Sequence, residues 1–189
     1  MKAQIFLAAV LLATLSTVGT SQKNDPIAES LRRAANTEDE RIARLPYDVR
    51  SLVGVQGIFV LVEYLDEDSK AVGLTEDQLK TDIELKLRLA GIKVNSSEDR
   101  RFSDDSFTIY VNITSIRRDL LLVYSASVQL RQDVYLARKP NRYCERATTW
   151  QKSCIGTVGE SKATTVIRDA VKDRTDMFVN DYLTANPKK

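Results

Sequence analysis

The 189-residue sequence contains no histidine. Without an imidazole, the chain lacks the commonest general base, the usual activator of a nucleophilic serine or cysteine, and a principal zinc ligand. The 28 basic and 26 acidic residues almost cancel, so no strong overall field favours a nucleic acid partner. We therefore expect a protein that is not an enzyme, holds no cofactor and no metal, and does not bind nucleic acid.

Long apolar runs are also scarce, and the one that stands out lies at the start of the chain. Lys2 precedes the apolar run from Ile5 to Leu15, and small residues follow it up to Ser21. This order is typical of a secretory signal peptide, which predicts that residues 1–21 are removed near Ser21 and Gln22. The run is shorter than the roughly 20 residues that span a bilayer, so an uncleaved anchor is the less favoured alternative. We expect a periplasmic or secreted protein that is not an integral membrane protein.

Cysteine occurs only twice, at Cys144 and Cys154. In an oxidising compartment these two thiols are expected to form the single possible intrachain disulfide. A loop this short would contribute roughly 2–3 kcal/mol in the chain-entropy account of disulfides. A redox-active or metal-binding pair is the alternative, and the spacing is not C-x-x-C.

The first half of the mature chain predicts a helical arm followed by a β-α-β unit. Residues 22–46 are charged and alanine-rich, and we expect two short helical stretches there, interrupted at Asn36 and Thr37. Residues 57–65 form an apolar β-branched run typical of a strand. Residues 74–91 carry a capping box at Thr75 and an apolar stripe, which predict a helix. A short strand at residues 92–94 would complete the unit.

The second half predicts long antiparallel strands. Polar and apolar residues alternate over residues 107–114 and again from Leu121 to Arg138. A flat strand over the second range would measure roughly 55–60 Å, whereas a compact domain of this size is about 40 Å across. The strand must bend, bulge or project, and we expect the break near Gln132 and Asp133.

A loop at residues 139–146, a strand at 147–155 and a long helix at 161–185 follow. The order of elements predicts an α+β fold with a mainly antiparallel sheet of four to five strands and two helices on one face. We expect three regions: the signal peptide 1–21, a helical arm or linker 22–46, and a single α+β domain 47–189.

The densest group of basic and aromatic residues lies between the last two predicted strands. Arginine with tyrosine or tryptophan is typical of protein interfaces and of sites for anionic ligands. The predicted disulfide would hold this group rigid. The candidate partner-binding residues are Arg138, Lys139, Arg142, Tyr143, Arg146 and Trp150. The alternative is a charged surface loop with a structural tryptophan.

Other polar residues form weaker patterns. Asp66 and Asp68 begin an acidic turn, but Lys70 occupies the fifth position of any calcium loop counted from Asp66. Glu63 and Asp133 are acids within strand-like runs and would support acid–base chemistry only if the fold brought them together. We interpret the first two as turn and helix-terminus residues, and the second two as strand ends or bulges.

The segments GLTEDQL and LRLAGIKV and the ending TANP are similar to uncharacterised exported bacterial proteins. In order of elements and in export, the region from Gly57 to Ala185 resembles small periplasmic α+β modules. Two such families are the lipopolysaccharide-assembly lipoprotein and the N-terminal domain of the Tol-system translocation protein. The resemblance implies a role in assembly with a protein partner and no catalysis. The chain lacks the lipidation cysteine of the first family and the propeller repeats of the second.

Together, these observations predict an exported, non-catalytic interaction or assembly module whose partner is a protein of the cell envelope. The alternative is a binding protein for an anionic lipid or glycan, which would need an apolar pocket between sheet and helix with arginines at its mouth. A third possibility is a carboxylate-dependent enzyme, which would need two acids converging in a cleft.

Overall fold

A computed structural model of the chain describes residues 26–96, 98 and 107–187. The chain divides into two compact units, Met1–Arg41 and Ile42–Lys189. The predicted signal peptide, residues 1–21, lies outside the described residues. Everything that follows on the sheet, its helices and the candidate site concerns the second unit.

Helix α2 (Pro26–Arg44) is one continuous helix, so the interruption predicted at Asn36 and Thr37 is wrong. The Thr37 hydroxyl donates to the carbonyl of Arg33 at 2.8 Å, one turn back. Threonine therefore bonds to the preceding turn of the helix and does not cap a new one. Ile27 and Leu31 are about two-thirds exposed, with 68% and 65% of their surfaces accessible.

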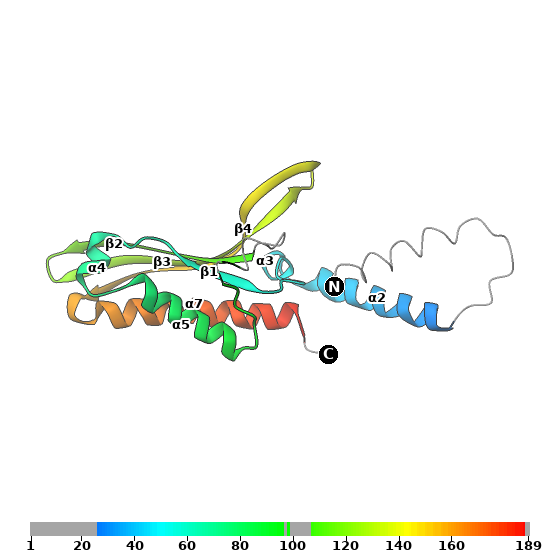
Figure 1. The fold of residues 1–189 in the computed structure, drawn as a ribbon, viewed down its shortest axis with the longest axis horizontal. Coiled ribbons are helices and arrows are strands. Elements are labelled where there is room, and N and C mark those ends of the chain that lie inside the picture. The colour runs from blue at the N-terminus through cyan, green and yellow to red at the C-terminus, as the bar shows by residue number, and fades with distance from the viewer. Residues whose placement is uncertain (1–25, 97, 99–106, 188–189) are drawn as a thin grey trace. The chain divides into compact units, whose positions relative to one another are not determined.

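The sheet has four strands in the order β1-β2-β3-β4 (Figure 1). Its members are β1 (Ile58–Val62), β2 (Phe107–Arg118), β3 (Leu121–Leu136) and β4 (Lys139–Gly159). β1 runs parallel to β2, and the other two pairings are antiparallel. The predicted α+β class is confirmed, with a mixed sheet. Val94 forms a parallel bridge with Ile58, which confirms the β-α-β unit.

Two long helices, α5 (Glu76–Leu89) and α7 (Ala163–Ala185), cover one face of the sheet (Figure 1). The Thr75 hydroxyl accepts a hydrogen bond from the Gln78 amide at 3.3 Å, so α5 begins at the predicted cap. Leu79, Ile83 and Leu87 form its buried stripe. The apolar residues at alternate positions of β1, β2 and β3 fill the other side of this core.

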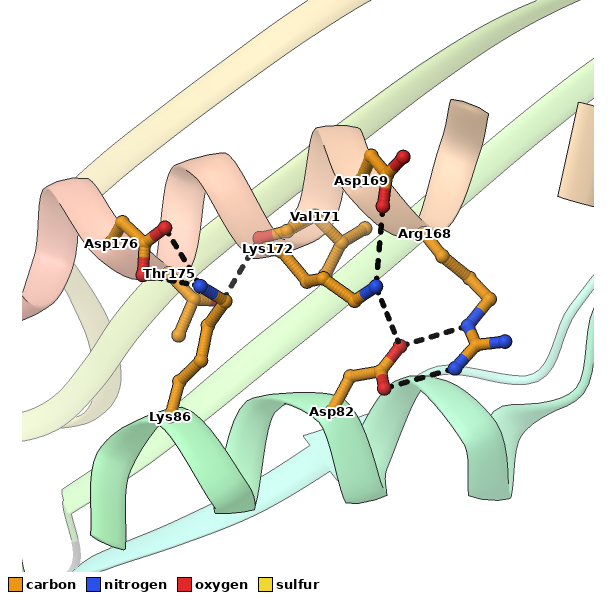
Figure 2. A network of polar contacts seen from close by, with 8 residues as sticks. All are labelled: Asp82, Lys86, Arg168, Asp169, Val171, Lys172, Thr175 and Asp176. Atoms are coloured by element: carbon orange, nitrogen blue, oxygen red, sulfur yellow. Dashed lines mark hydrogen bonds and ion pairs between the residues drawn. The ribbon is translucent and has the colours of Figure 1, made fainter. Parts of the chain in front are cut away.

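Ion pairs join the solvent-facing sides of α5 and α7 (Figure 2). The Arg168 guanidinium donates to both oxygens of Asp82, at 2.8 and 3.0 Å. The Lys172 ammonium lies 3.9 Å from Asp82, and Lys86 donates to Asp176 at 2.6 Å. The hydrogen bond from Arg168 lowers the pKa of Asp82, with nearby cations adding to the effect. These contacts fix the two helices side by side as one layer.

Three short elements complete the fold: α3 (Tyr47–Arg50), α4 (Glu67–Ala71) and the 3₁₀ turn η2 (Glu160–Lys162). α3 is held to β4 because the Lys152 ammonium donates to Asp48 at 2.9 Å. This hydrogen bond lowers the pKa of Asp48 and raises that of Lys152. α3 therefore lies against β4 near the middle of that strand.

The predicted loop at 139–146 and the predicted Cys144–Cys154 disulfide are both wrong. β3 and β4 are joined by a turn of Ala137 and Arg138, and the supposed loop is the first part of β4. Both cysteines are free. They lie in the same strand, and ten strand residues span on the order of 30 Å, far beyond the reach of one disulfide.

Candidate functional site

The outer half of the β3–β4 hairpin, residues 131–149, forms a projecting segment that we call the hairpin arm. Leu130 and Trp150 are paired across the strands and are both buried. Beyond them no residue of the arm is buried. The register shifts between Leu130 and Arg131 and again between Gln132 and Val134. These bulges confirm the expected break near Gln132 and Asp133, and the arm bends away from the helices there (Figure 1).

A polar clamp holds the two strands of the arm together. The Tyr143 hydroxyl donates to one oxygen of Asp133 at 2.5 Å, and the Arg146 amide donates to the other at 2.8 Å. Arg146 has a φ of 52°, the left-handed conformation that a bulge uses. The hydrogen bond to Asp133 raises the pKa of Tyr143 to about 12. Tyr135 packs on Tyr143, with ring centroids 5.6 Å apart.

The base of the arm is tied to the residue that follows α3. The Gln132 side-chain amide donates to the Ser51 carbonyl at 3.1 Å and to the Thr149 hydroxyl at 2.7 Å. The Ser51 hydroxyl in turn lies 3.2 Å from the Thr149 carbonyl, to which it donates. The direction of the arm is therefore fixed at its base by side-chain hydrogen bonds.

Five of the six predicted partner-binding residues lie on the arm, all of them exposed: Arg138, Lys139, Arg142, Tyr143 and Arg146. In the described part of the chain, none of these four cations has a carboxylate within ion-pair distance. Tyr143 is 51% exposed even though its hydroxyl is bonded. The arm as a whole carries five basic residues and two acidic ones. The structure thus gathers unpaired cations and half-exposed tyrosine rings on one hairpin.

Trp150, the sixth predicted residue, belongs to the core and not to the surface. Only 1% of it is exposed. Its ring meets Phe178 of α7 edge to face at a centroid distance of 5.1 Å, and its indole N–H donates to Asp181 at 2.9 Å. A side chain enclosed in this way cannot contact a partner, so Trp150 is removed from the candidate site.

Sequence reasoning missed the clamp between Asp133, Tyr143 and Arg146. Asp133 was interpreted only as a strand end or a bulge, and Tyr143 was placed in a loop. A two-residue turn alone would put Tyr135 opposite Pro140, and it is a register shift between Tyr135 and Leu136 that puts Tyr135 opposite Tyr143. The sequence carried no signal for this shift.

A shallow groove of about 350 Å³ lies between the sheet and α7. Tyr124 and Cys154 line its sheet side, and Asp169, Asp173 and Arg174 line its helix side. Arg174 is the one cation in this lining, and Asp173 lies 3.8 Å from it. Two acids and one paired arginine do not suit an anion, so the groove lacks the cationic mouth that a site for an anionic lipid or glycan would need.

The remaining acids have structural partners. Asp66 caps α4 by accepting from the Ser69 amide at 2.7 Å, and it also accepts from the Ser115 amide and hydroxyl. Glu63 accepts from Asn112, and a hydrogen bond from Tyr110 is the main cause that lowers its pKa. Among residues 26–96, 98 and 107–187, no group of three or more acids and cysteines could hold a metal ion.

Comparison with known proteins gives no match to this chain, either among family models or among the curated proteins. In the described part of the chain, no helix is both long enough and apolar enough to cross a membrane.

Proposed function

We propose that this protein is an exported, non-catalytic interaction module that binds an acidic surface of a cell-envelope protein with its hairpin arm. The observation that carries the proposal is the absence of any buried residue between Leu130 and Trp150 on the hairpin. A folded segment that contributes nothing to the core is free to contact another molecule. This reasoning supports contact by the arm and leaves the identity of the partner open.

The chemistry of the arm supports an acidic protein partner. Arginine binds carboxylates through paired hydrogen bonds, and tyrosine supplies rigid contact area with a polar tip. Arg138, Lys139 and Arg142 surround the turn of the hairpin, so a partner meets them first. With five basic and two acidic residues, the arm has a net charge of +3 (5 − 2), which favours encounter with an acidic surface.

The clamp supports the proposal because it orders the arm before any partner arrives. Asp133 joins the two strands through Tyr143 and Arg146, and Gln132 ties the base to Ser51. Ordering a segment on binding costs free energy, so a segment that is already ordered retains more of its contact energy as affinity. The clamp takes the role that sequence reasoning gave to a disulfide.

The test is capture of envelope proteins on the immobilised protein, with the charges of the arm reversed. The variant carries Arg138→Glu, Lys139→Glu and Arg142→Glu together. We expect it to lose capture of every specific partner, because three unpaired cations become anions facing an acidic surface. Unchanged capture by this variant contradicts the proposal.

A matched control reverses three exposed cations away from the arm: Lys93→Glu, Arg118→Glu and Lys162→Glu. The change in net charge is the same, and in the described part of the chain none of these three makes an ion pair. We expect the control variant to retain capture. Loss in both variants would show that net charge alone governs binding.

A second candidate function is binding of an anionic lipid or glycan. The observation that favours it is the set of unpaired cations Arg138, Lys139 and Arg142, which would suit phosphate or carboxylate groups equally well. Co-sedimentation with vesicles containing an anionic phospholipid separates the two functions. Binding to vesicles, without capture of a protein, would favour the second candidate.

A further inference from the structure

The backbone N–H and C=O groups at the two outer edges of the sheet, along β2 and along β4, have different surroundings. Beyond the end of β1, acids cover the outer edge of β2. Asp66 accepts from the Ser115 amide at 2.6 Å, and Asp68 accepts from the Arg117 amide at 2.9 Å. A carboxylate on an edge strand both satisfies its N–H groups and repels another strand. This edge is therefore closed to further pairing.

The outer edge of β4 has no such cover between Gln151 and Gly159. In the described part of the chain, no group outside β3 forms a hydrogen bond with the backbone of this segment. The covered part of β4 ends at Thr149, whose carbonyl accepts from Ser51. The register between β3 and β4 is regular over residues 150–159, so no bulge twists the edge away.

The side chains of this segment offer no protection either. Its sequence, QKSCIGTVG, contains no proline and one charged residue. That residue, Lys152, points to the helical layer, where it donates to Asp48. Ile155 lies on the opposite, open face of the sheet with 82% of its surface exposed. A long, regularly paired and nearly uncharged edge strand is a template for another strand.

We propose that residues 151–159 of β4 pair antiparallel with the same segment of a second copy of this chain, with Ile155 opposite Ile155 of the second copy. Pairing about a two-fold axis through Ile155 keeps facing side chains on the same face of the sheet. The two four-stranded sheets then form one continuous sheet.

Charge and size both favour a second copy in this register. Lys152 lies opposite Val158, so no like charges meet across the axis. Cys154 lies opposite Gly156, where the Tyr124 ring occupies the space that a side chain on Gly156 would fill. On the open face, Ile155 gains a directly opposite aliphatic side chain, the kind of cross-strand pair that stabilises sheets.

An apolar patch on the open face supports the same axis. Ile116 is paired through the sheet with Val123, and both are exposed, with 53% and 39% of their surfaces accessible. Ile155 lies on the same face, opposite Ser125 and diagonal to Val123, whereas Leu121 lies opposite Gly159 at the end of the strand pair. Pairing at Ile155 joins the patches of two copies into one apolar surface, and exposed patches of this kind mark contact surfaces.

The pairing does not depend on the function proposed for the arm. It involves the body of the sheet, and it leaves the arms of both copies exposed. A dimer would present two arms, so a partner with two acidic sites would be held more tightly than by a single arm.

The test measures the mass of the purified protein by sedimentation and combines two charged variants, Ile155→Lys and Ile155→Glu. We expect the unaltered protein to be a dimer and each variant alone to be a monomer, because like charges would lie opposite each other at the axis. An equimolar mixture of the two variants should recover the dimer. Because Ile155 is 82% exposed, the circular dichroism and thermal midpoint of each monomer should match those of the unaltered protein.

The register is tested by crosslinking in a Cys144→Ser, Cys154→Ser background. Ile155→Cys should form an intermolecular disulfide on mild oxidation. Ser153→Cys, which would lie opposite Thr157, should form little or none. Efficient crosslinking at Ser153→Cys would overturn the register.

A protein that stays monomeric up to roughly 100 μM, where a stable interface of ordinary size would be saturated, would overturn the pairing itself. So would a dimer that survives Ile155→Lys. If the monomer instead binds a strand of another protein at β4, the second copy is the wrong occupant and the proposal fails.

Discussion

The β3–β4 hairpin consists of two halves with the same alternating sequence pattern and different surroundings. In the half next to the helices, every second side chain is buried, as at Tyr124, Val128 and Leu130. In the arm, Val134 and Leu136 continue the alternation and remain only partly buried. Phe178 of α7 packs against Trp150, the last buried residue of β4 before the arm. Alternation therefore places side chains on one face, and only a covering layer makes that face a core.

Within one hairpin, the inner half contributes to the stability of the fold, whereas the arm is the half that we propose to bind a partner. The inner half is stabilised by apolar burial, which depends on the helices. The arm is held by hydrogen bonds around Asp133 and Gln132, which are local and exposed to water. Changes in the inner half should unfold the protein, whereas changes in the arm should alter binding and leave the fold intact.

The largest expected effect is that of Trp150→Ala. The substitution opens a cavity against Phe178 and leaves the Asp181 carboxylate without its indole donor. We expect the free energy of unfolding to fall by about 3–5 kcal/mol, measured by denaturant titration. The matched change in the arm is Tyr135→Ala, which removes a 68% exposed ring and should barely move the midpoint. Equal losses in the two variants would show that the arm is part of the core.

Asp66→Ala should have the next largest effect, because it removes the cap of α4 and the acceptor of the Ser115 amide. We expect a loss of roughly 1–3 kcal/mol at neutral pH. Burial opposes ionisation of Asp66, but the hydrogen bonds from Ser115 and Ser69 prevail and lower its pKa.

The sign of the pH dependence follows from that lowered pKa. The stabilisation by Asp66 is fully present above the unfolded pKa of about 3.9 and is lost as the pH falls through the folded pKa. The gap between the unfolding free energies of wild type and Asp66→Ala should therefore be constant near neutrality and shrink below roughly pH 4. A gap that widens in acid would refute the role assigned to this carboxylate.

Asp82→Asn should have a smaller effect, because it weakens the bidentate contact with Arg168 at the surface of the helical layer. We expect a loss of at most about 1 kcal/mol, decreasing with added salt. Thermal unfolding at low and high ionic strength measures it. If the loss does not depend on salt, the contact acts through hydrogen-bond geometry alone.

Tyr143→Phe should have the smallest effect on global stability and should act only in the arm. We expect faster amide exchange over residues 132–147, read by hydrogen–deuterium exchange, with unchanged exchange in the inner half. A loss of protection in the inner half as well would show that the two halves unfold as one unit.

Titration of the tyrosines provides a second measure of the clamp. The bond to Asp133 raises the pKa of Tyr143 to about 12. Its stabilising contribution is therefore present below the unfolded pKa of about 10 and is lost as the pH rises through the folded pKa. In Asp133→Asn, the ultraviolet titration of Tyr143 should move back toward its ordinary range.

Much of the fold could be predicted from local signals. The cap at Thr75 and the apolar stripe of α5 predict that helix within a residue or two, because both act within one turn of the chain. A break in the long strand follows from its length, and the accumulation of polar residues places it near Gln132 and Asp133. The interruption at Thr37 was wrong because a threonine can either cap a helix or bond back to the preceding turn, and the sequence does not choose between them.

The candidate site was predicted in part. Arg138, Lys139 and Arg142 were identified because clustered cations are visible in composition. Trp150 was assigned to the surface and Cys144 to a disulfide for one reason: the register of β3 and β4 was unknown. The turn at Ala137 and Arg138 puts the two cysteines in one strand. The register shifts beyond the turn pair Trp150 with Leu130, where Trp150 contacts Phe178 of α7.

The amino-acid sequence by itself determined most of the helices and strands, since caps and periodicity depend on neighbours a few residues away. It did not determine that Thr37 lies inside a helix or that residues 139–146 form a strand. The sequence also determined that the chain lacks histidine chemistry and that its cations cluster near one turn. Only the tertiary structure decided which part of the long hairpin is core and which is arm, because burial depends on the helix that packs beneath it. It likewise decided that Asp66 and Asp68 close the edge of β2 while β4 stays open, because those contacts join residues about fifty positions apart.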